Sequence, residues 1–199
     1  MDRKKRGVDM EERTVNNRIQ KMIEEMCPEG VEYKKIGDIA EITTGKGITK
    51  RDMSEDGLYP IISGGKEPMG FYHEKNRDAN TVTVARAGTA GYVSFMTQDF
   101  YLNDKCFSVI PKDNALLPKY LYYALKNSED QLTGMKSKGT VPTINVAKLG
   151  VFEIPVPPLA VQREVVRVLD TMTELTAELT ARTKQYEYYR DTILQFNGK

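Results

Sequence analysis

The stretch EIPVPPLAVQREVVRVLD, residues 153–170, joins a strand-like run, Val151 to Pro155, to the start of a long amphipathic helix. Pro158 fits the first turn of that helix. Apolar residues then recur in a three-four alternation that only Arg182 interrupts. They are Val165, Val168, Met172, Leu175, Leu179, Tyr186, Tyr189, Ile193 and Phe196. This seam predicts a helix over residues 159–196, roughly 57 Å long at 1.5 Å per residue.

A helix of this length carries more apolar surface than a small domain can cover, so the seam predicts a partner, as in a coiled coil. Three partners are open: the N-terminal helix of the same chain, a second copy of the protein, or a different subunit. The alternative is a helix folded back over its own domain as ordinary core. The residues expected at the dimer or subunit interface are Val165, Val168, Met172, Leu175, Leu179, Tyr186, Tyr189 and Ile193.

The remaining chain divides into two further segments. Residues 1–30 form an N-terminal helical segment, in which residues 9–26 have apolar side chains spaced by four, three and four, and Cys27-Pro28-Glu29-Gly30 ends the helix. Residues 31–157 form a globular domain, and residues 158–199 form the long helix. The whole is predicted to be an α+β fold: an irregular β-sheet domain with a long C-terminal helix and a short N-terminal one.

Short β-like pieces bounded by glycine, asparagine or proline fill the globular domain. They are IAEITTG, YPIISGG, TVTVARAGTAGYVSFM and KCFSVIPKD, and RAGTAGY within the third predicts a hairpin or bulged turn. One helix is expected among them, PKYLYYALKNSEDQL, residues 118–132, with Leu121, Leu125 and Leu132 on or near one face.

Composition excludes several classes of protein. No apolar run is long enough to cross a bilayer, and the basic start of the chain has no apolar stretch after it, so a cytoplasmic location is expected. Cys27 and Cys106 stand far apart, without a CxxC motif, and predict neither a disulfide framework nor a metal site. The net charge is +1, so any DNA-binding surface must be a local arrangement of charge.

Catalytic patterns are missing from the sequence. The single histidine, His73, has no metal-ligand or triad spacing around it. The glycine-rich stretches TGKGITK and SGGKEPMG match neither the phosphate loop nor a dinucleotide-binding fingerprint. We therefore expect a protein that binds or positions something, without a cofactor of its own, rather than an enzyme.

Three glycine-containing loops could bind DNA. Glycine lets backbone amides approach phosphates closely, and Lys, Arg and Thr supply donors to phosphates and base edges. A solvated surface loop is the commoner fate of such a sequence, so each loop alone is weak support. The predicted DNA-binding residues are Lys46, Lys50 and Arg51 in the first loop, Lys66, Tyr72 and Arg77 in the second, and Lys136, Lys138 and Thr140 in the third, with Lys75 and Asn145 beside them.

The order of these motifs resembles the specificity subunits of type I restriction-modification systems. The resemblance covers residues 31 to about 190, and its most specific part is GTVPTINVAKLGVFEIPVPPLAVQREVVRVLD, residues 139–170. In that family this run closes a target-recognition domain and opens a long conserved helix.

The resemblance implies a division of labour. The recognition domain reads one half of a bipartite site in double-stranded DNA, and the long helix docks methyltransferase (modification) subunits, which bind S-adenosylmethionine. A restriction subunit, where present, uses ATP and Mg²⁺. The chain itself is then a non-catalytic subunit of a methyltransferase or endonuclease complex.

Family members usually carry two recognition domains, whereas this sequence shows one. We expect a half-length form that pairs with a second copy of itself as a homodimer, which reads a symmetric site. Two alternatives remain open: a coiled-coil adaptor whose β-rich domain binds a protein partner, and a gene fragment used to shuffle recognition domains.

Overall fold

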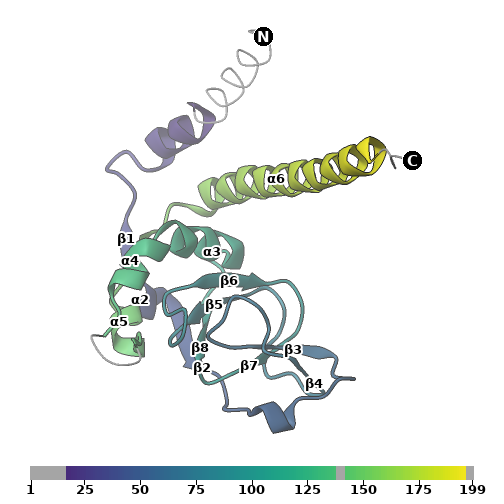
Figure 1. The fold of residues 1–199 in the computed structure, drawn as a ribbon. Coiled ribbons are helices and arrows are strands. Elements are labelled where there is room, and N and C mark those ends of the chain that lie inside the picture. The colour runs from purple at the N-terminus through teal and green to yellow at the C-terminus, as the bar shows by residue number, and fades with distance from the viewer. Residues whose placement is uncertain (1–16, 138–141, 196–199) are drawn as a thin grey trace.

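The structure is a computed structural model that describes residues 17–137 and 142–195. A four-stranded antiparallel sheet lies at its centre (Figure 1). Its strands, in spatial order, are β2 (Ala40–Thr44), β8 (Cys106–Pro111), β5 (Thr81–Ala85) and β6 (Val93–Met96). β5 is buried along its whole length. Because side chains alternate along a strand, Val82 and Val84 join one apolar core and Ala85 joins another on the opposite face.

Helices cover the face of the sheet that Val82 and Val84 line. They are α2 (Ile36–Ile39), α3 (Pro118–Asn127), α4 (Glu129–Gly134) and α5 (Val146–Gly150). The expected leucines Leu121, Leu125 and Leu132 are fully buried in this core.

The prediction of one helix over residues 118–132 is wrong. Ser128, at φ −102° and ψ 13°, separates α3 from α4. The break lets the Glu129 carboxylate accept a hydrogen bond from the Val93 backbone N–H at 3.1 Å and pair with Lys126. Tertiary contacts to β6 therefore outweigh the local preference for a continuous helix.

A second, three-stranded sheet packs against the other face of the central sheet. It consists of β4 (Phe71–Tyr72), β3 (Tyr59–Ile62) and β7 (Tyr101–Leu102), in that spatial order. The smaller core between the two sheets contains Ala85, Phe100, Leu102 and Cys106. The expected strands and the hairpin at residues 81–96 are thus confirmed.

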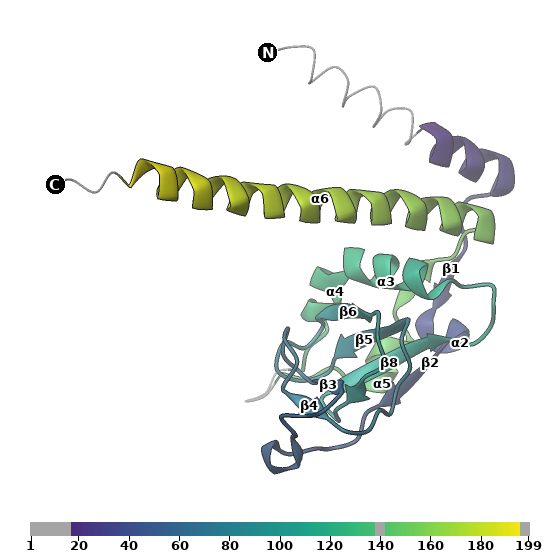
Figure 2. The ribbon, with the colours of Figure 1, turned by 90° about the vertical axis from the view of Figure 1, so that its right-hand side faces the viewer.

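A two-stranded ribbon closes the domain. β1 (Tyr33–Lys35) and β9 (Glu153–Pro155) pair antiparallel, with Tyr33 opposite Pro155. The chain therefore enters and leaves the domain at neighbouring points, and the helical residues 17–26 and the long helix both start from there (Figure 2). Residues 9–16 of the predicted N-terminal helix lie outside the described residues.

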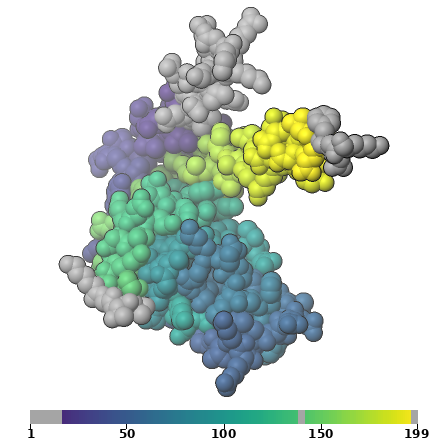
Figure 3. All heavy atoms as spheres, in the orientation of Figure 1, coloured from purple at the N-terminus to yellow at the C-terminus, as the bar shows by residue number. Residues whose placement is uncertain are grey.

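The long helix is α6 (Leu159–Leu194), and its 36 residues give about 54 Å at 1.5 Å per residue. Its first turns are buried against the domain: Val161 and Gln162 are 1% and 0% exposed. Val165 and Val166 pack on the main core. Residues 171–194 are exposed throughout, and this part projects away from the body of the domain (Figure 3).

The α+β class and the long helix are therefore confirmed. Phe196, at the predicted end of the seam, lies outside the described residues. Within residues 17–137 and 142–195, no helix combines the length and apolar character that a bilayer crossing requires.

Candidate nucleic-acid interface

Strand pairing brings four loops to one edge of the central sheet, and a backbone contact to Arg86 adds a fifth. β2 and β5 end where β8 begins, since Thr44 pairs with Phe107 and Ala85 with Cys106. The parallel pairing of β3 with β7 adds the segment after Ile62 to the same edge. We call this surface the loop edge; it consists of residues 45–49, 63–67, 86–92, 103–105 and 136–137.

Backbone contacts hold the glycine-rich loops of the loop edge together. The Gly64 carbonyl accepts hydrogen bonds from the backbone N–H of Thr89 at 2.7 Å and from its hydroxyl at 2.8 Å. A Cβ added at Gly64 would lie 2.1 Å from the carbonyl oxygen of Ala87, and Gly88 has φ +77°. Only glycine fits so close a contact between two backbones. The loops of residues 63–67 and 86–92 therefore form one rigid unit.

Buried polar groups tie the remaining loops to that unit. Asn103 is 2% exposed, and its side-chain amide donates to the Ile48 carbonyl at 3.3 Å. The backbone N–H of Ile144 donates to the Arg86 carbonyl at 2.9 Å, and that of Ser137 to the Thr143 carbonyl, which brings in residues 136–137 and 142–144. The Cys106 thiol donates to the Ser63 carbonyl at 2.7 Å. Burial raises the pKa of this thiol to about 12, so it is a structural donor and not a nucleophile at neutral pH.

Basic side chains outnumber acidic ones at the loop edge. The basic residues are Lys46, Lys66, Arg86, Lys105 and Lys136, and the acidic ones are Glu67 and Asp104. The lysines at 46, 66 and 105 are exposed, and no carboxylate of the described residues holds them. The loop edge thus has the local positive charge that phosphate binding requires.

Tyr92 contributes an aromatic group to the same surface. The ammonium groups of Lys126 and Lys66 lie 4.5 Å and 5.8 Å from its ring centroid. Arg86 similarly lies over the Phe107 ring at 5.6 Å. The contacts position Lys66 and Arg86 without neutralising them, whereas Lys126 is paired with the Glu129 carboxylate.

Lys50 and Arg51 lie on the turn that directly follows the first loop, and Tyr72 lies on β4, at the end of the domain far from α6 (Figure 1). Lys50 and Arg51 form a short 3₁₀ turn, and the Asp52 carboxylate accepts from the backbone and hydroxyl of Thr49. These bonds lower the pKa of Asp52, which therefore stays charged beside the two cations. The acidic residues around this turn and β4 are Asp52, Glu55, Asp56 and Glu74. These four carboxylates outnumber the two cations Lys50 and Arg51, so this part of the domain, which we call the acidic end, lacks the excess positive charge of the loop edge.

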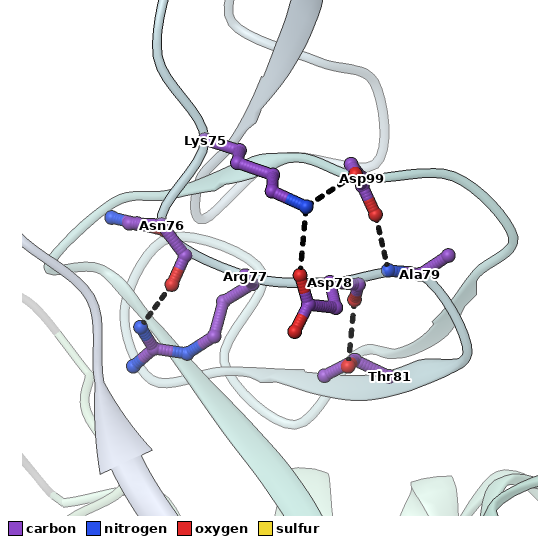
Figure 4. Close-up of polar contacts among 7 residues, drawn as sticks. All are labelled: Lys75, Asn76, Arg77, Asp78, Ala79, Thr81 and Asp99. Carbon is purple, nitrogen blue, oxygen red and sulfur yellow. Dashed lines mark hydrogen bonds and ion pairs between the residues drawn. The ribbon is translucent and has the colours of Figure 1, made fainter.

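Lys75 and Arg77 are occupied by internal contacts (Figure 4). The Lys75 ammonium lies 2.9 Å from Asp78 and 2.6 Å from Asp99, and the bond from Lys75 lowers the pKa of Asp99. The Arg77 guanidinium donates to the Ser108 hydroxyl at 2.8 Å and to Asn76 and residues 43–44 of β2. Arg77 thus supports the end of β2 from inside the domain.

The third predicted loop is only partly described, since Lys138 and Thr140 lie outside the described residues. At its base, the Ser137 backbone N–H donates to the Thr143 carbonyl at 2.9 Å. Asn145 has a local role, because its side-chain oxygen caps α5 through the Lys148 N–H at 2.8 Å.

The sequence reading missed Arg86, Tyr92 and Lys105. Arg86 and Tyr92 lie in RAGTAGY, a pattern that by itself predicts only a turn, and Lys105 precedes β8. The available signal was the antiparallel order of the strands. Once β2, β5 and β8 are paired, the ends next to these residues must meet.

The seam of α6 has two environments. Val165 packs on the main core and Val168 is half-buried. The outer members are exposed: Met172 48%, Leu175 54%, Leu179 68%, Tyr186 66%, Tyr189 53% and Ile193 67%. The outer seam is therefore an apolar face that the described residues leave uncovered.

Comparisons with known proteins place this fold in a family. Residues 28–186 match the type I restriction modification DNA specificity domain. A type I specificity subunit of Mycoplasma pneumoniae is 29% identical over 168 residues, which cover 80% of this chain and 46% of that protein. The EcoR124I/EcoR124II specificity subunit of Escherichia coli is 37% identical over 105 residues, 48% of this chain and 26% of that one.

Solved structures show the same fold. The crystal structure of a type I restriction-modification S subunit from M. genitalium superposes with a TM-score of 0.71 at 22% identity. The superposition covers 81% of this chain and 44% of that one, so the chain spans less than half of the length of these three relatives. Because the family match extends over most of the domain and much of α6, the chain belongs to the type I restriction-modification DNA specificity family.

Proposed function

We propose that the chain is a DNA specificity component that reads one half of a bipartite site through the loop edge. The observation that supports this most is the convergence of Lys46, Lys66, Arg86, Lys105 and Lys136 on loops that backbone contacts make rigid. Rigid donors lose little conformational freedom on binding. Contacts between positive side chains and phosphates also release counterions from DNA, which favours binding.

The outer seam of α6 supports a second part of the proposal. Residues such as Leu175 and Leu179 are more than half exposed, and apolar faces of this length mark contact surfaces. A second copy of the chain packs antiparallel against this face. The paired helices then dock methyltransferase subunits, which bind S-adenosylmethionine. A restriction subunit that uses ATP and Mg²⁺ joins where the system cleaves DNA. The site of action is the cytoplasm.

A helix of about 54 Å sets the scale of the DNA site. With about 3.4 Å per base pair, two copies joined along α6 span half-sites about 16 base pairs apart at most. A twofold dimer reads a symmetric bipartite sequence.

Duplex-binding measurements test the DNA part of the proposal. Fluorescence anisotropy is measured on the chain co-purified with a methyltransferase subunit, over a series of salt concentrations. Lys46→Ala/Lys105→Ala should weaken binding at least about 10-fold and lower the salt slope by about two, since two phosphate contacts are removed. The matched control Lys50→Ala/Arg51→Ala removes the same charge from the acidic end of the domain and should change the affinity less than about threefold.

Equal losses in the two variants would contradict the assignment to the loop edge. Affinity for duplex DNA that does not depend on salt would instead favour a protein-binding adaptor, because protein contacts release few counterions. Mapping adenine methylation in cells that co-express the two proteins gives the independent readout, and a symmetric bipartite motif is expected.

Sedimentation measurements test the second part. Leu175→Ser/Leu179→Ser should weaken self-association at least about 100-fold, because each buried leucine contributes about 2 kcal/mol. Glu187→Ser, on the same exposed helix but outside the seam, is the control and should leave association unchanged. A dimer that persists unchanged in the double leucine variant would exclude the seam as its interface.

A further inference from the structure

We propose that Gln162 and Asp170 are positioning residues that fix the direction of α6 on the recognition domain and so select the spacing between DNA half-sites. This rests on the proposed function, in which α6 links two recognition domains. The inference concerns the inner twelve residues of α6, Leu159 to Asp170, and their contacts with α3 and the loop before it.

Gln162 anchors the start of α6. Its side chain is 0% exposed and uses its carbonyl oxygen and both of its N–H groups. The oxygen accepts from the Leu117 backbone N–H at 2.9 Å, at the start of α3. The amide nitrogen donates to the carbonyls of Ala115 and Pro157, each at 2.8 Å. One amide thus joins α6, the segment that enters it and the loop before α3.

No other side chain makes the same three bonds. Glutamate has the same shape but offers oxygen where the Ala115 and Pro157 carbonyls need a donor. Leucine or methionine would leave three backbone groups without a partner in a buried place. The proline-rich exit of the domain is therefore held by the Gln162 amide as well as by its own stiffness.

Asp170 provides a second anchor, eight residues further along α6 in the sequence. Its carboxylate accepts a hydrogen bond from the Tyr123 hydroxyl at 2.5 Å, and the Lys119 ammonium lies 3.3 Å away. Burial, followed by the bond to Asp170, raises the pKa of Tyr123 to about 12, so the phenol remains protonated and remains a donor. Lys119 and Tyr123 are one turn apart on α3, and both face the same carboxylate.

Two contact points fix the direction of α6 on the domain, whereas a helix held at one point could pivot about it. Gln162 and Asp170 are separated by about 12 Å along the helix axis, and beyond Asp170 every described residue of α6 is exposed. The free part, residues 171–194, extends about 36 Å. A tilt of about 10° at the anchors would move its far end by about 6 Å, nearly two base pairs. The anchors therefore have leverage over half-site spacing without touching DNA.

Distances between spin labels test the anchors without DNA. Labels are placed at Gln98→Cys in the domain and Glu187→Cys on α6, both exposed, in a Cys27→Ser background, while Cys106 stays buried. Labelled chains are diluted with unlabelled ones, so that only distances within a chain are seen. A single narrow distribution is expected for the parent, and Gln162→Glu, Asp170→Asn and Tyr123→Phe should each at least double its width. Glu174→Gln, one turn beyond Asp170, is the matched control and should leave the width unchanged.

Binding to duplexes of different spacer length tests the consequence. The parent complex should prefer one spacer, and Asp170→Asn or Tyr123→Phe should reduce the preference over a spacer two base pairs longer by at least about fivefold. Affinity for an isolated half-site should stay within about twofold, which a general loss of stability would not allow. If Gln162→Glu fails to fold by circular dichroism, the Asp170 and Tyr123 variants decide.

The outcomes separate the two proposals. Unchanged label distances in both Asp170→Asn and Tyr123→Phe overturn the anchors, whatever the DNA results. Broadened distances with unchanged spacer preference overturn the link to spacing. A parent complex that binds no duplex overturns the proposed function, while the label distances still decide whether the anchors set the direction of α6.

Discussion

The inner and outer parts of α6 carry the same apolar repeat but lie in opposite surroundings. Val165 packs on the core of the domain, whereas Leu179, on the same seam, is 68% exposed. The repeat therefore states which side of the helix is apolar, and the rest of the fold decides what covers it. The alternative of a helix folded back over its own domain holds for the inner seam only. The outer seam has no cover among the described residues, and its partner stays a prediction.

The largest test of this comparison replaces an apolar residue by aspartate in each part. Val161→Asp places an unpaired charge at a position 1% exposed and should lower the free energy of unfolding by about 3–5 kcal/mol. Leu179→Asp should change it by less than about 0.5 kcal/mol at concentrations where the chain is monomeric. Urea unfolding followed by circular dichroism measures both. Similar losses in the two variants would mean that the outer seam is also covered within one chain.

The second test compares two glycines, Gly64 at a close backbone contact and Gly134 in open space. Gly64→Ala forces a Cβ to within 2.1 Å of the Ala87 carbonyl and should cost about 2 kcal/mol or more. Gly134→Ala, in α4, meets nothing within 4 Å and should be neutral or stabilising by about 0.5–1 kcal/mol. Thermal unfolding compares the pair. A tolerated alanine at Gly64 would show that the loop edge is looser than its backbone contacts indicate.

The smallest expected effect concerns ion pairs at the two parts of α6. Glu164 is buried, and its bond with Arg167 lowers its pKa, with Arg18 also near. Stability from this pair is present above the pKa of the unfolded glutamate and is lost as pH falls through the lower folded value. Its contribution is about 1 kcal/mol or less. The free energy of unfolding, measured between pH 7 and pH 3, should depend less on pH in Glu164→Gln than in the parent protein.

The exposed pair of Glu178 and Arg182, at 3.9 Å, supplies the comparison. Glu178→Gln should leave the pH dependence unchanged, since exposed pairs contribute little. If both substitutions reduce the pH dependence of the free energy of unfolding equally, the effect at Glu164 does not come from its burial.

Sequence reasoning reached the regular parts of this fold. Apolar residues recur with a period of about 3.5 along the long helix and of 2 along the strands. These local patterns predict α6, the hairpin of β5 and β6 and the α+β class. The break at Ser128 could not be read in this way, because its cause is a hydrogen bond from distant Val93 to Glu129.

The candidate site was reached only in part. Lys46, Lys66 and Lys136 are at the loop edge, while Lys50, Arg51 and Tyr72 lie at the acidic end of the domain. Residue type and neighbouring glycines could not separate these groups, because what separates them is the pairing of strands far apart in the sequence. Arg77 shows the other limit: its neutral partners Ser108 and Thr43 are on other strands, so nothing nearby in the sequence marks it as internal.

The pairing of β1 with β9 makes the recognition domain an exchangeable cassette. Tyr33 and Pro155 are direct neighbours, so the chain leaves the domain where it entered. A domain with the same two strands could replace residues 36–152 without redirecting α6 only if it also kept the partners of Gln162 and Asp170, at residues 115–123. The loop edge lies within the same interval but uses other residues. Under the proposed function, exchange of the domain between such strands would change the DNA sequence that is read, while α6 and the surfaces it offers to partners stayed the same.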